Sequence, residues 1–598
     1  MVRKPINIIE SGSSAGFGRN ICIFAVTAAA NLLMCILLPR IASVCLSSED
    51  SMMRITLSGL YSGVPSAAGV SVNPLLARVL TRLYQLRPEA EWLGILFYAG
   101  IGTSATVMET ILLRGAGSAK DLLKRSAAAA FFSLCFVAGH LLMPTTAAAA
   151  SYFAALSIAS CREYFKLREK DGRFFPAFLW GLLSVVSAVI SFMLREFVFL
   201  CAAPLIILMF VYSLLRARQS ASRRTVFLLT ITLAILGSAI AGMHLDHSIG
   251  TREQKACLEN YERVLSKYGL ADYEENKAFY ERLDISEEAY QCMLRKMYGL
   301  SDELTLEKLG AAADYTENLN REALPRRIIR SAAAAFDALS DNYVKREFLA
   351  FALMCLILFV FCSQRRISKS LTEIGGAFIY GFLCMAVLGF RNRMDADAAR
   401  VILILFTPVV LSAFSGHEFD AQSSTDEKTP LSRIGFSVLT AILCLAVAAS
   451  SFVWWQDDTY PRQKLLVRTE MMYEMEQYMQ DYPDGFMFYR PMDFVTAGDL
   501  LFTAHHQNKP LHIDSLGNRM AWTAEYARRN EQFGFEKALD AFLGKENVFY
   551  AQQGRSITKV PVTIALQRYG KTLEEACALQ AGDYEILIYR IVDIEESE

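Results

Sequence analysis

Residues 21–44 read ICIFAVTAAANLLMCILLPRIASV, and residues 45–50, directly after them, read CLSSED. A helix rises about 1.5 Å per residue, so the first stretch extends over about 36 Å and can cross a bilayer core of about 30 Å. It is too long for the apolar part of a secretion signal and lacks a clear small-residue cleavage site, which predicts an uncleaved first span. Two adjacent acids therefore stand where the chain leaves the membrane.

Similar apolar stretches recur along the chain, which is 598 residues long and 53% hydrophobic, more than is usual for a soluble protein. They predict about eleven spans, of which the pair hinged at Pro144 is either two spans or one hairpin that does not fully cross. The stretches are 21–44, 92–113, 127–143, 145–160, 174–194, 197–215, 225–244, 347–362, 372–390, 399–414 and 433–455.

Clusters of Lys and Arg follow every second span, at about residues 114–125, 162–173, 216–224 and 365–369. Short loops rich in Lys and Arg stay in the cytoplasm. The alternation therefore predicts a cytoplasmic N-terminus and an extracytoplasmic C-terminus.

Three longer polar segments then lie outside, at 45–91, 245–346 and 456–598. In the first, residues 73–86 place Leu75, Leu76, Val79, Leu80 and Leu83 on one side and Arg78 and Arg82 on the other, which predicts a helix lying in the membrane surface. The second has helical spacing. The third combines helix-like stretches at 462–481, 535–543 and 561–569 with strand-like ones at 485–489, 547–550 and 584–594.

The predicted fold is therefore mainly α: a polytopic transmembrane helical bundle with a small outer α/β C-terminal domain. Residues 1–455 form the bundle, including the outer loop 45–91 and the outer helical segment 245–346, and residues 456–598 form the α/β domain.

The composition and motifs exclude several classes of function. The net charge is −1, which argues against nucleic acid as a partner. The sequence has no P-loop, no GxSxG and no HExxH, so nucleotide-driven transport has no support.

The paired acids Glu49 and Asp50 are the sharpest local feature. Partial loss of hydration at a membrane boundary disfavours the charged carboxylate and makes it a better base near neutral pH. If this segment is extended, one acid points towards a cavity and the other away. The alternative is a solvated loop whose Ser and acidic residues cap a helix.

Arginines stand at two other predicted outer turns. Arg195 precedes Glu196 between two spans, and Arg391, Arg393 and Arg400 surround a short turn. Arginine offers a rigid fork for phosphate, although ion pairing with neighbouring acids explains the same residues equally well. Asp395 and Asp397 lack a matching further carboxylate, so no metal site is assigned and a need for a divalent metal stays open.

This layout resembles the GT-C superfamily of polytopic membrane glycosyltransferases, and a poorly characterised bacterial group within it. The resemblance covers most of the chain in layout and rests on short motifs: the acids after span one, SGLYSG at 58–63, the helix beginning Asn73-Pro74, FMLR at 192–195 and the ending at 584–592. Many members carry Asp-Asp or Asp-x-Asp where this chain has Glu-Asp, which leaves open whether Glu49 or Asp50 is the base.

The resemblance implies an enzyme of the bacterial plasma membrane that moves a sugar from a polyprenyl-phosphate donor to an envelope glycan, polymer or lipid acceptor. It implies an acid of the first outer loop, Asp50 or Glu49, as the base, and it implies Arg195, Arg391, Arg393 and Arg400 as ligands of the donor phosphate. The alternative is a non-enzymatic transporter or flippase of lipid-linked glycans. Such a protein needs polar residues near mid-bilayer, where this chain has few: Asn31, Glu109 and His140.

We predict that a reporter fused at residue 420 faces the cytoplasm and one fused at residue 520 faces outside, because the basic loops alternate. Protease or thiol-reagent accessibility in intact cells measures this. The reversed pair of results would place every proposed site on the wrong side of the membrane.

Overall fold

The computed structural model describes residues 12–41, 46–67, 71–116, 119–170, 174–216, 249–320, 396–415, 470–489, 512–516, 521–554, 560–582 and 584–594, with several single residues between them. The chain divides into two compact units. The bundle unit comprises Met1–Val44, Gly94–Ala239 and Leu324–Thr459. The sheet unit comprises Cys45–Leu93, Ile240–Ala323 and Tyr460–Glu598, so it contains the first of the longer polar segments and most of the other two.

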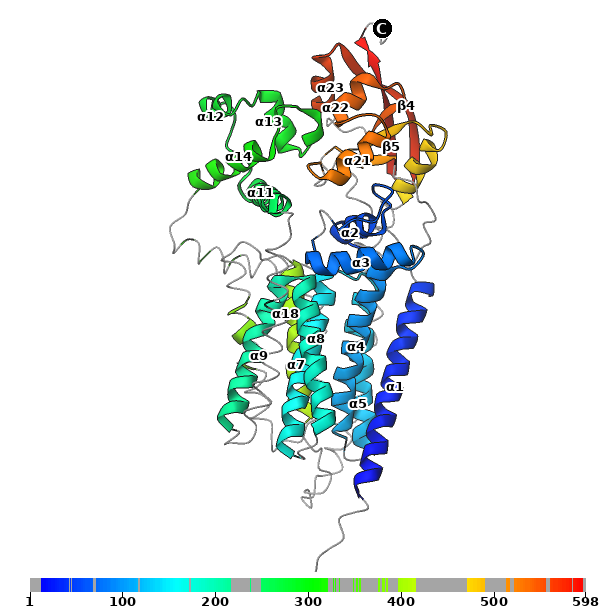
Figure 1. Ribbon diagram of the computed structural model, residues 1–598, viewed down its shortest axis with the longest axis vertical. Helices are drawn as coiled ribbons and strands as arrows, with labels where there is room; N and C mark the ends of the chain where they lie inside the picture. Colours follow the sequence, from blue (N-terminus) through cyan, green and yellow to red (C-terminus); the bar gives the residue numbers. More distant parts are fainter. Residues whose placement is uncertain are drawn as a thin grey trace, which may run out of the picture. The chain divides into compact units, whose positions relative to one another are not determined.

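The bundle unit consists of long helices (Figure 1), in which α7 packs against α8, α9 and α18. The helices are α1 (Gly12–Ile41), α4 (Trp92–Arg114), α5 (Ala119–Phe132), the π-helical η1 (Ser133–Val137), α6 (Ala138–Leu142), α7 (Thr146–Lys170), α8 (Phe174–Leu194), α9 (Glu196–Arg216) and α18 (Ala396–Ser415).

Within the described residues, three helices are long and apolar enough to cross a membrane: Gly18–Arg40, Trp92–Arg114 and Phe175–Leu194. The chain is therefore a helical membrane protein by length and composition. The count of about eleven spans stays a prediction: the described stretches 145–160, 197–215 and 399–414 are not among these three helices, and 433–455 lies outside the described residues.

The predicted break at Pro144 is confirmed, since α6 ends at Leu142 and α7 begins at Thr146. α7 alone has 25 residues, enough to cross a bilayer core of about 30 Å. The preceding run from α5 to α6 contains the π-helical segment Ser133–Val137. Whether both helical runs cross the membrane stays a prediction.

The sheet unit is built on five strands in the order β2-β1-β3-β5-β4. They are β1 (Phe486–Tyr489), β2 (Ile513–Ser515), β3 (Val548–Gln553), β4 (Lys571–Ala581) and β5 (Tyr584–Asp593). β1 pairs in parallel with β2 and β3, whereas β5 pairs antiparallel with β3 and β4. The strands predicted at 485–489, 547–550 and 584–594 are thus confirmed as β1, β3 and β5.

Both faces of the sheet are buried at β1 and β3, where successive side chains point to opposite sides and nearly all are buried. On β1, Phe486 and Phe488 join one apolar cluster, while Met487 and Tyr489 join another with Met471, Met475 and Met479. α21 (Ala524–Gln532), α22 (Ala538–Gly544) and α23 (Val560–Gln567) also belong to this unit. The last two confirm the helices predicted at 535–543 and 561–569.

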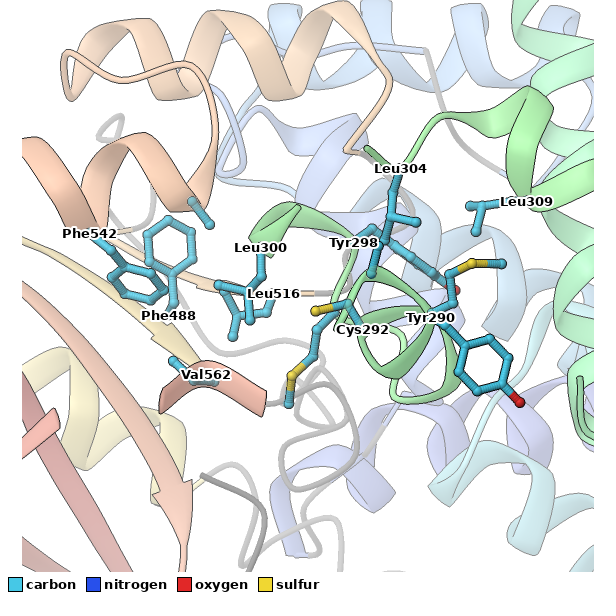
Figure 2. Packing of buried hydrophobic residues seen from close by; sticks show 14 of the residues in the cluster. Tyr290, Cys292, Tyr298, Leu300, Leu304, Leu309, Phe488, Leu516, Phe542 and Val562 are labelled. Carbon is cyan, nitrogen blue, oxygen red and sulfur yellow. The ribbon is translucent and has the colours of Figure 1, made fainter. Parts of the chain in front are cut away.

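The helical segment 249–320 shares the first of these clusters with the sheet, as Figure 2 shows for Tyr298 and Leu300 beside Leu516 and Phe488. Ion pairs from Arg568 to Glu288 and Glu303 lie at the same junction. The segment contains α11 (Ile249–Tyr268), α12 (Lys277–Arg282), α13 (Glu287–Leu294), η2 (Tyr298–Leu300) and α14 (Leu306–Leu319), as its helical spacing predicted.

Two short helices of the sheet unit follow α1 in the sequence, and polar caps set where they begin. α2 (Ser48–Ser58) has Ser47 as its N-cap, and α3 (Pro74–Leu86) has Asn73, whose side chain accepts from the backbone of Leu75. These caps satisfy backbone N–H groups that have no partner within the helix.

The faces of α3 differ from the prediction. Leu80 does not share an exposed face with Val79, since it is buried with Ala77, Thr81 and Tyr84 while Val79 is 55% exposed. Leu86 is 78% exposed. The prediction of one apolar face missed that α3 also packs within the protein. That α3 lies in the membrane surface stays a prediction.

We predict that Gly59→Ala destabilises the sheet unit by about 3 kcal/mol, against about 1 kcal/mol for the control Gly570→Ala. Both glycines have positive φ, but a Cβ at Gly59 would lie 2.6 Å from Pro65 Cδ, whereas nothing lies within 4 Å at Gly570. Thermal unfolding in detergent compares the two variants, and equal losses of stability would refute this packing account.

Candidate functional site

Asp50 lies in the first turn of α2, nine residues beyond the end of α1 in the chain. Ser47 Oγ accepts from the Asp50 backbone N–H at 3.2 Å and donates to Asp50 Oδ2 at 2.6 Å. A carboxylate that accepts hydrogen bonds at this position is held in a defined orientation.

The two candidate bases have different surroundings. Asp50 is 2% exposed, whereas Glu49 is exposed to solvent. The segment is helical rather than extended, and adjacent side chains still diverge because each helical residue turns by about 100°. The capping that the sequence offered as an alternative is present, and it is combined with a buried acid.

Arg54 follows Asp50 by four residues and therefore lies on the same side of α2. It is 1% exposed and forms an ion pair with Glu91, to which its Nε donates at 2.8 Å. Glu91 immediately precedes α4, and Leu93 N donates to Tyr84 OH of α3 at 3.2 Å. Within the sheet unit, the helix that carries Asp50 is thus tied through Arg54 to Glu91.

Arg195 is the single residue between α8 and α9. Its backbone N–H donates to Ser191 O at 2.9 Å, and its carbonyl accepts from Val198 N at 3.2 Å. The sequence predicted almost no loop here, and the structure has none. Arg195 is half-buried and Glu196 is exposed.

Arg400 is 4% exposed on α18, a helix that packs against α7 and α9. Arg195 and Arg400 both belong to the bundle unit, whereas Asp50 and Glu49 belong to the sheet unit. Arg391 and Arg393 lie outside the described residues, as does Asp395. Within the part of the chain that the structure describes, no group of His, Cys, Asp and Glu side chains could hold a metal ion.

Two of the few polar residues within the spans meet in the bundle. Asn31 Nδ2 donates to Glu109 Oε2 at 2.7 Å, and Ser133 Oγ also donates to the Glu109 carboxylate. Thr27 and Thr110 form a hydrogen bond at 2.9 Å one turn away. These contacts join α1, α4 and the π-helical segment, which is how polar side chains commonly hold membrane helices together.

Three residues that sequence reasoning did not select form a buried polar cluster in the sheet unit. Arg529 pairs with Asp514, and Tyr61 donates from its hydroxyl to Asp514 Oδ2 at 3.4 Å. The only available signal was Tyr61 within the SGLYSG motif, since the partners lie more than 450 residues away in the chain.

No known protein family and no curated protein matches the chain. Among solved structures, the chain is similar to ArnT from Cupriavidus metallidurans bound to undecaprenyl phosphate, with 9% sequence identity over 96% of this chain and 98% of that one. The TM-score is 0.34, which is too low to transfer any residue's role.

Proposed function

We propose that this protein is a membrane glycosyltransferase of the hexosyltransferase type. It would move a sugar from a polyprenyl-phosphate donor to an envelope glycan, polymer or lipid acceptor on the outer face of the membrane. Asp50 would act as the base, and Arg195, Arg391, Arg393 and Arg400 would hold the donor phosphate.

The observation that carries the proposal is the buried carboxylate of Asp50 at the start of α2, a few residues after a helix that can cross a membrane. Burying an ionisable group costs free energy, so it is retained where it is needed. Ser47, at the N-cap of α2, hydrogen-bonds the carboxylate and holds it in one orientation. Glu49, which is exposed, is the second choice.

The chemistry needs few groups. The acceptor hydroxyl oxygen attacks the anomeric carbon of the sugar, and the bond from that carbon to the phosphate oxygen breaks with its electron pair going to the phosphate. Asp50 takes the hydroxyl proton. A phosphate anion leaves without a general acid, so the protein must supply a base and positive charge for the leaving group.

The arginines would supply that positive charge. Their guanidinium groups form bidentate contacts with phosphate oxygens that an ammonium group cannot reproduce. The ArnT structure holds undecaprenyl phosphate, a lipid of the same class. The proposal for this chain rests on its own arginines.

The alternative is a transporter or flippase of lipid-linked glycans, which needs a polar substrate site within the bilayer. Glu109, the acid noted within the spans, accepts hydrogen bonds from Asn31 and Ser133. These contacts favour a role in holding helices together, and they therefore favour the enzyme over the transporter.

We predict that Asp50→Asn lowers the single-turnover rate of sugar transfer from a polyprenyl-phosphate donor about 10²–10⁴-fold, because the base is lost. Donor affinity and thermal stability should stay near those of the wild type. The matched control is Glu49→Gln, which alters the exposed neighbour and should change the rate far less.

Full transfer by Asp50→Asn, by Glu49→Gln and by the double variant would reduce these acids to helix caps and end this mechanism. A wild-type protein that transfers no sugar but moves lipid-linked glycan across vesicles would establish the transporter.

We predict that Arg195→Lys and Arg400→Lys, and likewise Arg391→Lys and Arg393→Lys, weaken donor binding about 10- to 100-fold, because the fork is lost although the charge stays. Isothermal titration with a polyprenyl-phosphate sugar measures the affinity. Arg528→Lys is the control, since Arg528 is exposed on α21. If all four variants bind the donor as tightly as the wild type, these arginines do not hold the phosphate and serve only in ion pairs within the protein.

A further inference from the structure

The turn after α2 brings Tyr61 back into the protein. Gly59 ends α2 with φ of 87° and Gly63 has φ of 76°, a conformation that other residues adopt at a cost. Between them the Tyr61 backbone N–H donates to Ile55 O at 3.2 Å. The SGLYSG motif therefore forms a compact turn that presents one tyrosine.

The Tyr61 side chain is enclosed by the C-terminal region. It is 2% exposed, its hydroxyl donates to Asp514 Oδ2 at 3.4 Å, and the Arg529 guanidinium carbon lies 4.4 Å from its ring centroid. Burial raises the pKa of Tyr61 well above its usual value, so the phenol keeps its proton and remains a donor. Arg529 binds the same carboxylate, so all three groups act together.

Two more hydrogen bonds flank this contact. Ser66 Oγ donates to Glu525 Oε1 at 2.8 Å, and Gln532 Nε2 donates to Ser62 O at 3.1 Å. Tyr526 packs against Tyr61, with Met52 and Ile55 of α2 against the pair. The C-terminal region thus holds α2 and its turn from several sides.

Stability alone does not explain a charged group at the centre of this contact. Arg529 is fully buried, and its Nε and Nη1 have no hydrogen-bond partner among the described residues. A buried ion pair costs desolvation that apolar side chains of similar size would avoid, and such pairs are best attested as devices that define one arrangement.

We propose that Tyr61 is a positioning residue, through which the Asp514–Arg529 pair of the C-terminal region fixes the orientation of α2 and hence of Asp50. The inference rests on the proposed function of Asp50. It gives the C-terminal region a part in the transfer step itself, in addition to any contact with the acceptor.

The test is Tyr61→Phe, which keeps the ring over Arg529 and removes only the hydroxyl. The control is Tyr569→Phe, because Tyr569 is 49% exposed in the same region. We expect the single-turnover rate to fall about tenfold with donor affinity unchanged, since small displacements of a catalytic group are costly. Hydrogen exchange of the α2 amides should rise about tenfold, while that of β1 and β3 stays unchanged.

A purely structural role would lower the melting temperature and leave the rate intact below it; that result overturns the proposal, as does unchanged exchange in α2. Arg529→Lys provides a second variant, which keeps the charge beside Asp514 but loses the planar stack, and should move rate and exchange in the same direction. If the wild type transfers no sugar, the proposed function fails. Hydrogen exchange of the α2 amides, compared between the wild type and Tyr61→Phe, still decides whether Tyr61 holds this helix in place.

Discussion

The buried pair of Asp514 and Arg529 is the contact around which distant parts of the sheet unit assemble. Side chains of Arg529 and Asp514 are 0% and 4% exposed, so neither charge can be left without the other. Desolvation by itself would lower the pKa of Arg529, but Asp514 beside it raises the pKa and keeps the guanidinium charged. Because Asp514 lies on β2 and Arg529 on α21, their pairing sets how this helix lies against the edge of the sheet.

The cation also needs aromatic neighbours, and these come from different segments. Tyr61, Phe486 and Tyr526 have ring centroids between 4.4 and 5.4 Å from the Arg529 guanidinium carbon. Aromatic faces stabilise a desolvated cation, here one whose Nε and Nη1 have no hydrogen-bond partner among the described residues. The turn after α2 is thereby joined to the strand β1, although more than 400 residues separate them in the chain.

Much of the local structure was predictable because it depends on neighbours in the chain. Ser47, Asn73, Ser286, Thr305 and Thr523 each cap the helix that follows, through a short-range hydrogen bond. The strands β1, β3 and β5 were predicted from their apolar and β-branched residues.

Two strands were missed. β2 has only three residues, too few to show the alternation of apolar and polar residues that marks a strand, and the sequence of β4, KTLEEACALQA, consists largely of residues that favour helices. β4 is nevertheless a strand because ten of its residues pair with β5, and this pairing outweighs their preference for a helix. Gly570 and Gly582, which both have positive φ, stand at its two ends.

The sequence by itself determined that the chain is an apolar helical membrane protein with an acidic pair after its first span, because hydrophobic length and charge are properties of contiguous residues. It also determined that Arg195 stands between two apolar helices with almost no loop. Only the tertiary structure decided that Asp50 is buried and Glu49 exposed, and that the first loop, the helical segment and the C-terminal region form one unit. The physical reason is that burial and ion pairing are settled by residues far apart in the chain, as Tyr61, Asp514 and Arg529 are, and no local pattern records such a partner.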